Sequence, residues 1–324
     1  MKKVWLVFVS LIICELLLRI LGFKPYISTP FYLKSTPSHF LAPNDTFGFA
    51  LNPGSFNVNI NGLDFKANHN YGNTRKVLAD SGHSKQSVLH LYGCSFAYGF
   101  GISDSATLAT QLQHKLGLRY KVKSFAVPGH GDVQGLLKLK NQIKQGQKPN
   151  LVIFGFCYFH AQRNVLNANY RIHIKQGLNE QSAACRFPYV ASNQNQFNIS
   201  FEPAKSIYKH WLFRRKLSLV NLFQTTTDAL FNAQTGQNET QWVFMQLKQL
   251  CAQNDIRLII APLTRHKNMS SYISFFNKQN IAVANTMLNI ADSVYNNQPF
   301  DSHPNGIATA YYAQKIVNTI NKTE

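Results

Sequence analysis

Cysteine is scarce in this chain of 324 residues, and its spacing carries little information. The five cysteines form no CxxC pair and no dense pattern; they are Cys14, Cys94, Cys157, Cys185 and Cys251. This arrangement excludes a disulfide framework, and we expect no metal site and no cofactor. The four cysteines after Cys14 are interpreted as small buried hydrophobes, with room for one disulfide in an oxidising compartment.

Acidic side chains are also scarce: 14 stand against 33 lysines and arginines, giving a formal net charge of +19. The imbalance is largest over residues 86–237, which hold 17 basic and 5 acidic residues. A positive field of this kind attracts anionic polysaccharide, anionic lipid head groups or nucleic acid. The chain has no long basic run, zinc-finger spacing or RNA-binding signature, so we expect no nucleic-acid partner.

Long apolar runs are missing except within residues 1–24. There Lys2 and Lys3 precede VWLVFVSLIICELLLRILGF, an apolar stretch of about the length that spans a bilayer. Glu15 and Arg19 interrupt it, but on a helix they stand one turn apart and can pair. No small-residue cleavage site follows, so we predict an uncleaved transmembrane anchor, with a buried amphipathic helix as the alternative. The two lysines favour a cytoplasmic N-terminus and an extracytoplasmic body.

The remaining sequence predicts a small β-rich segment followed by one large α/β domain. Residues 25–85 are rich in Pro, Asn, Gly and aromatics, with short alternating runs broken by turn signals. Over residues 86–324, apolar strand-like runs alternate with amphipathic helical patterns, which is typical of βα units and a parallel sheet. Residues 165–237 interrupt the series without a clean period. We interpret them as an insertion over the carboxyl ends of the strands, in the position of a substrate lid.

Two short motifs could place catalytic chemistry on this sheet. Ser95, in YGCSFAYGFG, follows the first strand of the α/β domain, and open parallel sheets bind ligands beyond the carboxyl ends of their strands. An activated serine needs a base, usually a histidine oriented by a carboxylate. PFDSHPNG offers His303, with Asp301 two residues before it and Asp292 as a distant substitute. We expect the last helix to begin near Pro304, because proline suits a first helical turn.

With a third motif, FAVPGHGD, these segments resemble the blocks of the SGNH hydrolases, also called GDSL-type esterases, over residues 87–322. The stretches DTFGFALNPG and NYGNTR are similar to those of bacterial members with a membrane anchor. The resemblance implies an α/β fold, a three-layer α/β/α sandwich with a parallel flavodoxin-like sheet. It also implies Ser95 as the nucleophile, His303 as the base, Asp301 as its carboxylate and the Gly129 amide as an oxyanion donor.

Three positions depart from the family pattern. Cys94 stands where the first block has an aspartate, and Cys157 stands where the third block has an asparagine that donates to the oxyanion. His160 and Asn164 are the nearest polar residues that could replace this donor, whose loss typically costs about 100- to 1,000-fold in rate. Family members often place the acid three residues before the histidine, where this chain has Phe300.

The leading hypothesis is a serine esterase that removes acetyl groups from a cell-envelope or exported polysaccharide. The resemblance and the N-terminal segment together predict a single-pass protein of the bacterial inner membrane with its catalytic domain in the periplasm. An anionic glycan would suit the positive charge of residues 86–237. The same residues could instead pass the acyl group to a sugar hydroxyl, as an O-acyltransferase does. The changes at positions 94 and 157 motivate a third hypothesis, a catalytically degenerate protein that binds glycan or scaffolds an export complex.

Overall fold

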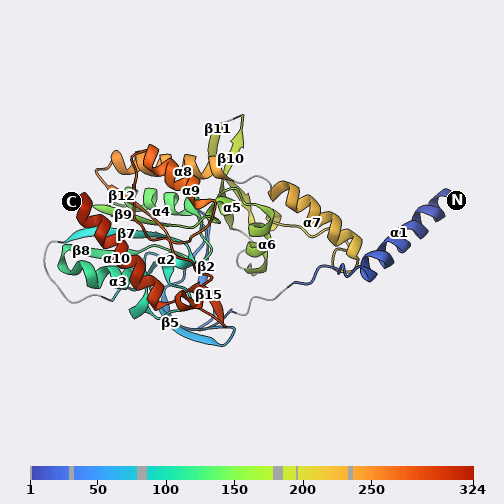
Figure 1. The fold of residues 1–324 in the computed structure, drawn as a ribbon, viewed down its shortest axis with the longest axis horizontal. Helices are drawn as coiled ribbons and strands as arrows, with labels where there is room; N and C mark the ends of the chain where they lie inside the picture. The colour runs from blue at the N-terminus through green and yellow to red at the C-terminus, as the bar shows by residue number, and fades with distance from the viewer. Residues whose placement is uncertain (1, 29–32, 79–85, 178–184, 195, 233–235) are drawn as a thin grey trace.

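The computed structural model describes residues 2–28, 33–78, 86–177, 185–194, 196–232 and 236–324 (Figure 1). Within them, a central sheet has nine strands in the order β1-β4-β5-β6-β8-β7-β9-β12-β13. The parallel strands are β7 (Ser87–Gly93), β8 (Tyr120–Ser124), β9 (Leu151–Phe156), β12 (Arg257–Pro262) and β13 (Ala282–Val283). Numbered along the chain, their order is the 2-1-3-4-5 of flavodoxin-like sheets. The predicted α/β class with a parallel central sheet is therefore confirmed.

Helices cover both faces of this sheet because its parallel strands are apolar on both sides. The covering helices are α3 (Leu108–Leu116), α4 (Asp132–Lys144), α8 (Gln237–Ala252), α9 (Met269–Lys278) and α10 (Gly306–Thr323). On one face, α3 and α10 share a buried core with Leu91 and Ile153. On the other face, α4, α8 and α9 share a second core with Tyr92 and Phe154. The alternation of these strand residues between two cores gives the three layers (Figure 1).

The segment predicted to be β-rich extends the same sheet. Its strands are β1 (Leu33–Thr36), β2 (Leu41–Asn44), β3 (Gly48–Leu51), β4 (Gly54–Ile60), β5 (Leu63–Asn70) and β6 (Thr74–Arg75). β1, β4, β5 and β6 are antiparallel neighbours, and β6 joins the parallel strands where Arg75 pairs with Ser124 of β8. β2 and β3 form a separate hairpin. Phe56 and Val58 lie in the same core as Leu91, so this segment has no independent core.

The predicted insertion contains helices and a hairpin, which are α6 (Ala168–Gly177), β10 (Arg186–Asn193), β11 (Gln196–Pro203) and α7 (Ser218–Asn232). A third apolar cluster joins this region to the body, with Tyr170, Phe187 and Ile207 buried in it and Phe49 of β3 packed against it. In Figure 1, α7 lies beyond α6 and leads toward α1. Short 3₁₀ helices lie at Asp104–Ala106, Gly117–Arg119, Ala204–Ser206 and Ser293–Tyr295.

The N-terminal helix α1 (Lys2–Ile20) projects from the body (Figure 1). Among the residues that the structure describes, no helix is both long and apolar enough to cross a membrane, so the predicted transmembrane helix is not supported. The physical reason is that this helix carries the charges of Lys2, Lys3, Glu15 and Arg19. It also has no buried residue, so the alternative of a buried amphipathic helix is wrong.

Glu15 and Arg19 attach α1 to the insertion. They pair as predicted, with 2.7 Å between Arg19 Nε and Glu15 Oε1. The Glu15 carboxylate also accepts hydrogen bonds of 2.9 Å from the amides of Ser218 and Leu219, at the start of α7. Arg19 donates to the carbonyl oxygen of Lys216 at 2.8 Å. A carboxylate at a helix N-terminus is favourable, so the two charges that interrupt the apolar stretch hold α1 against α7.

Candidate active site

Ser95 lies directly beyond the carboxyl end of β7, at the start of the short helix α2 (Ser95–Tyr98). Gly93, the last residue of β7, has φ +143° and pairs with Gly155 of β9. A Cβ atom on Gly93 would lie 2.7 Å from the carbonyl oxygen of Gly155 and 2.8 Å from the Cβ atom of Ala97. Glycine at both positions lets the chain turn at once from the strand into the helix that begins with Ser95.

His303 and Asp301 belong to a short strand, β15 (Asp301–Pro304), which pairs with β14 (Asn296–Asn297). The last helix begins near Pro304, as predicted, but Pro304 itself belongs to β15 and lies outside the first helical turn. The side chain of Asn305 accepts hydrogen bonds from the amides of Ile307 and Ala308, so it caps a helix that begins at Gly306. His303 is therefore presented by a strand end and lies outside the helix.

The structure brings Ser95, His303 and Asp301 into one hydrogen-bonded array. The distance from His303 Nε2 to Ser95 Oγ is 2.9 Å, and His303 Nδ1 lies 2.8 Å from Asp301 Oδ2 and 2.9 Å from Oδ1. When Nδ1–H donates to Asp301, the lone pair of Nε2 can accept the serine proton. The edges of Phe96 and Phe100 hold the imidazole, with ring centroids 5.5 and 5.0 Å from it.

Asp301 is the carboxylate partner of His303. Asp292 and Phe300, the two other positions noted in the sequence, do not take this role. The side chain of Asp292 accepts from the amide of Val294 at 3.1 Å and caps a 3₁₀ helix. Phe300, at the position where relatives often place the acid, is 44% exposed. Asp301 reaches the histidine because residues two apart on a strand, here β15, lie on the same side.

Gly129 lies in the loop that follows β8, with φ +86°. A Cβ atom there would lie 3.0 Å from Cζ of Phe49, so both the backbone conformation and the space favour glycine. Its carbonyl oxygen accepts a 2.6 Å hydrogen bond from the hydroxyl of Tyr170 in α6. No described residue accepts from its amide, which is thus free to donate to a ligand. Tyr170 belongs to the insertion, and its hydrogen bond fixes the loop that contains Gly129.

Asn164 is not free to act as an oxyanion donor. It belongs to α5 (His160–Asn164) and is fully buried. Its Nδ2 donates at 2.8 Å to both Asp132 Oδ2 and Thr240 Oγ1, and its Oδ1 accepts from the amide of Asp132 at 2.9 Å. Asn164 therefore caps α4 and joins it to α8, and the suggestion that it replaces the missing donor is wrong.

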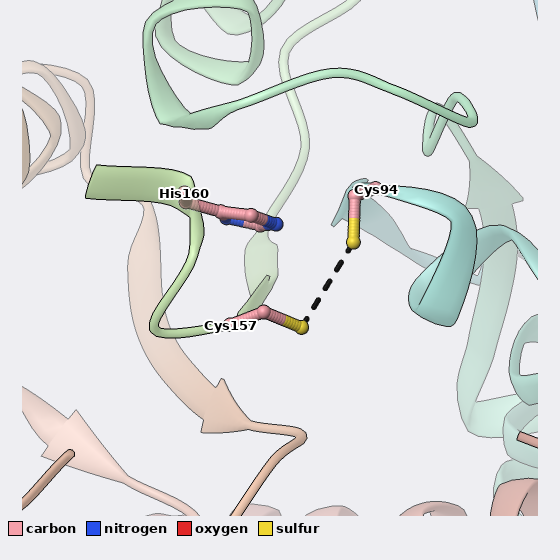
Figure 2. A group of neighbouring side chains, drawn as sticks. All are labelled: Cys94, Cys157 and His160. Carbon is pink, nitrogen blue, oxygen red and sulfur yellow. Dashed lines mark hydrogen bonds between the residues drawn. The ribbon is translucent and has the colours of Figure 1, made fainter. Parts of the chain in front are cut away.

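The side chain of His160 points toward those of Cys94 and Cys157 (Figure 2). Its Nδ1 lies 2.7 Å from Asp132 Oδ1, and its Nε2 is buried without a hydrogen-bond partner among the described residues. The Sγ atoms of Cys94 and Cys157 lie 3.9 Å apart, and all these side chains are fully buried. The role proposed for His160 as an oxyanion donor is thus not favoured by its position. Asp132 was not recognised from the sequence, although it ends the FAVPGHGD motif.

Burial and the neighbouring groups together shift the pKa values of this cluster. Burial opposes ionisation of Cys94, but the hydrogen bond with Cys157 and the charge of His160 outweigh it and hold the pKa of Cys94 well below its usual range. Burial and the neighbouring Cys94 raise the pKa of Cys157 well above its usual range. Burial would lower the pKa of His160, but the Asp132 and Cys94 charges raise it to about 9. The four cysteines after Cys14 are free and buried, as expected, and this pair also interacts through its sulfur atoms.

Arg75 of β6 stabilises the turn that follows Ser95. Its guanidinium donates to the carbonyl oxygens of Gly99 and Ile102, both at 2.6 Å, and of Tyr98 at 3.0 Å. It also pairs with the Asp104 carboxylate at 2.8 Å, and both side chains are buried. The N-terminal strands therefore support the site directly, which no motif in the sequence indicated.

No family model and no curated protein matches this chain. It is similar to the solved structure of TesA, with 12% identity, a TM-score of 0.43 and coverage of 74% of this chain and 100% of TesA. It is also similar to the psychrotrophic esterase EstA from Pseudoalteromonas sp., with 12% identity, a TM-score of 0.41 and coverage of 73% and 98%. A catalytic mutant of the acetylxylan esterase Axe2 from Geobacillus stearothermophilus gives 11% identity, a TM-score of 0.38 and coverage of 76% and 96%. GDSL-type lipolytic proteins are also among the similar structures. At these identities and TM-scores, similarity alone establishes neither the family nor the activity of this chain.

Proposed function

We propose that the protein is a serine hydrolase of the SGNH type that cleaves acyl esters. One observation carries the proposal: an unbroken series of hydrogen bonds runs from Ser95 Oγ through His303 to Asp301, with distances of 2.9 and 2.8 Å. The Ser95 residue is 5% exposed and the His303 side chain 22%, so the array reaches solvent, where a substrate can meet it. This geometry supplies the nucleophile, the base and the orienting carboxylate that acyl transfer uses.

The proposed reaction begins when Ser95 Oγ attacks the ester carbonyl carbon and His303 Nε2 takes the serine proton. Asp301 holds the imidazole in the required tautomer and stabilises the imidazolium that forms. His303 then protonates the leaving alcohol, and the acyl group remains on Ser95. A water molecule, deprotonated by His303, attacks the acyl-enzyme and releases the carboxylic acid, which restores the free serine.

Two backbone amides, those of Ser95 and Gly129, are the proposed oxyanion donors. Neither has an acceptor among the described residues, and Gly129 is held by the bond from Tyr170 to its carbonyl. Cys157 stands where relatives have a third donor, and it is fully buried. We therefore expect the enzyme to be about 100- to 1,000-fold slower than one with all three donors.

The proposed substrate is an acetylated, anionic polysaccharide of the cell envelope or an exported one. The formal net charge of +19 supports this choice, because a positive field concentrates anionic substrates. If it is correct, kcat/KM on an anionic acetylated glycan falls as salt is raised, whereas kcat/KM on a neutral acetyl ester does not. Equal salt dependence for the two substrates would contradict the anionic glycan.

We further propose that α1 attaches the protein to the periplasmic side of the bacterial inner membrane. Its support is the exposed apolar surface of the helix, where Trp5, Leu6 and Phe8 are 73%, 67% and 64% exposed. The double variant Trp5→Glu, Phe8→Glu should move the protein from the membrane pellet to the supernatant. A reporter fused to the carboxyl terminus that proves cytoplasmic would contradict the orientation.

The hydrolase proposal is tested with a serine-directed fluorophosphonate and an acetyl-ester assay on the full-length protein. The wild type and the control variant Ser105→Ala, at an exposed serine, should be labelled and active. Ser95→Ala should lose labelling and about 10⁴-fold or more in kcat. Failure of the wild type to label or to turn over any acetyl ester would favour the degenerate glycan-binding alternative. Accumulation of an acetylated sugar acceptor in place of acetate would favour the O-acyltransferase.

A further inference from the structure

We propose that Cys94, Cys157 and His160 form a binding site for one Zn²⁺ ion next to the serine array. Each offers one ligand atom, and the three atoms lie within 4.8 Å of one another in a fully buried cluster (Figure 2). This site is separate from the hydrolase proposal, because none of its ligands belongs to the Ser95–His303–Asp301 array. The sequence-based expectation of no metal site rested on spacing motifs, and these ligands are distant in the chain.

The sheet brings the two thiols together. Gly93 and Gly155 are paired in register on the adjacent strands β7 and β9. Cys94 follows directly after Gly93, and Cys157 lies two residues after Gly155, so both side chains leave the same edge of the sheet. Both glycines lack side chains at a point where a Cβ atom would lie within 3 Å of neighbouring atoms. The two sulfurs are therefore held near each other by the backbone itself.

The sulfur separation fits a tetrahedral ion. With Zn–S bonds of about 2.3 Å and tetrahedral angles, two thiolates on one Zn²⁺ are about 3.8 Å apart. The Sγ atoms of Cys94 and Cys157 lie 3.9 Å apart. A disulfide would require the sulfurs to approach to about 2.05 Å. The observed spacing matches the separation expected for two thiolates on one Zn²⁺ ion.

His160 supplies the second, independent observation. Its residue is 0% exposed, and Nε2 has no hydrogen-bond partner among the described residues. Its other nitrogen, Nδ1, lies 2.7 Å from the Asp132 carboxylate, which Asn164 holds in place at 2.8 Å. A carboxylate on the far nitrogen is the arrangement that fixes the tautomer and direction of a zinc-binding histidine. A ring nitrogen of His160 lies within 4.8 Å of both sulfur atoms, so it is placed to bind the same ion.

The ion would join the ends of β7 and β9 to α5. Three protein ligands leave one position of the tetrahedron, which a water molecule would take. Binding requires thiolates and a neutral imidazole, so it releases protons, and its free energy adds to the stability of the fold. Because Cys94 precedes Ser95, the ion would fix the turn that carries the proposed nucleophile.

The test measures metal on the full-length protein, stripped with a chelator under reducing conditions and then reconstituted with Zn²⁺ or Co²⁺. We expect one Zn²⁺ per chain by elemental analysis, and thiolate-to-metal charge-transfer absorption with Co²⁺. Cys94→Ala and Cys157→Ala should lose both signals, while the control Cys251→Ala, another buried cysteine outside the cluster, keeps them. Asp132→Asn, behind the histidine, should weaken Zn²⁺ binding by about 10- to 100-fold.

The proposal would be overturned by a wild type that retains no Zn²⁺ above background after reconstitution. Equal retention in Cys94→Ala and Cys251→Ala would overturn it as well. A protein purified without reductant that has lost two hydrogens and carries a 94–157 bridge, with no bound metal, would instead show a redox pair. If a cysteine variant fails to fold, His160→Gln provides the same readout, and an unchanged Co²⁺ spectrum in it overturns the site. None of these measurements depends on esterase activity.

Discussion

Cys94 and Ser95 are neighbours in the chain, yet each lies beside a different histidine–aspartate pair. Ser95 contacts His303, which Asp301 orients, and the side chains of that pair are 22% and 9% exposed. Cys94 lies near His160, which Asp132 orients, and the side chains of that pair are 0% exposed. The residue types are alike, but the first set reaches solvent, whereas the second is fully enclosed by the protein.

The comparison shows that three residue types in the right order do not by themselves make a catalytic site. A nucleophile must reach its substrate, and a base must have the proton it removes within hydrogen-bond distance. His303 Nε2 meets both conditions at Ser95, whereas His160 Nε2 has no partner among the described residues. Burial and pairing therefore separate the proposed active site from the proposed metal site.

The largest expected effect is a loss of kcat when the negative charge of Asp301, in the more exposed pair, is removed. Asp301→Asn should lower kcat on an acetyl ester by about 10⁴-fold, because the amide favours the wrong tautomer of His303. Asp292→Asn, the matched control, should keep wild-type kcat. Steady-state kinetics on both variants, with circular dichroism to verify folding, decide the matter. Similar kcat values for the two would mean that Asp301 is not the orienting carboxylate.

The next effect concerns Arg75, which stabilises the turn that follows Cys94 and Ser95. Arg75→Met leaves the buried Asp104 carboxylate without its partner and should lower the free energy of unfolding by about 3–5 kcal/mol. Arg119→Met is the control, because its ion pair with Glu324 is exposed and should contribute no more than about 1 kcal/mol. Urea unfolding of both variants measures the difference. Equal losses would show that Arg75 does not hold the turn carrying Cys94 and Ser95.

The smallest expected effect is a loss of stability at acidic pH. It arises from buried histidines that, unlike His160, have no hydrogen bond to a carboxylate of the described residues. Burial lowers the pKa of His90 to about 3 and the pKa of His69 to about 4. In the unfolded chain both titrate near about 6.5, so the unfolded state binds more protons below that pH and stability falls. Between about pH 7.5 and about pH 5, each should cost about 2 kcal/mol.

Urea unfolding at both pH values measures this loss in the wild type and in His90→Phe. The phenylalanine variant should lose about 2 kcal/mol less on acidification than the wild type. His114→Phe, at an exposed position, should keep the full loss. An acid loss unchanged in His90→Phe would show that this histidine is not the source.

Local patterns predicted the elements well. The strand-like and helical patterns over residues 86–324 correspond to alternating strands and helices in the structure, because each element buries a face that its own residues define. The helix α10 begins two residues after Pro304, because the side chain of Asn305 caps it. The structure does not support the transmembrane prediction, and Glu15 within that segment joins α1 to α7.

The sequence by itself determined the βα order, the place of Ser95 after a strand and the nearness of Asp301 to His303, since these depend on residues close in the chain. Only the tertiary structure decided that Cys94 meets Cys157, which stands 63 residues away, and that Arg75 supports the nucleophile turn. The physical reason is that β7 and β9 are neighbours in the sheet although β8 lies between them in the chain. Strand order and register cannot be read from the periodicity of any single segment.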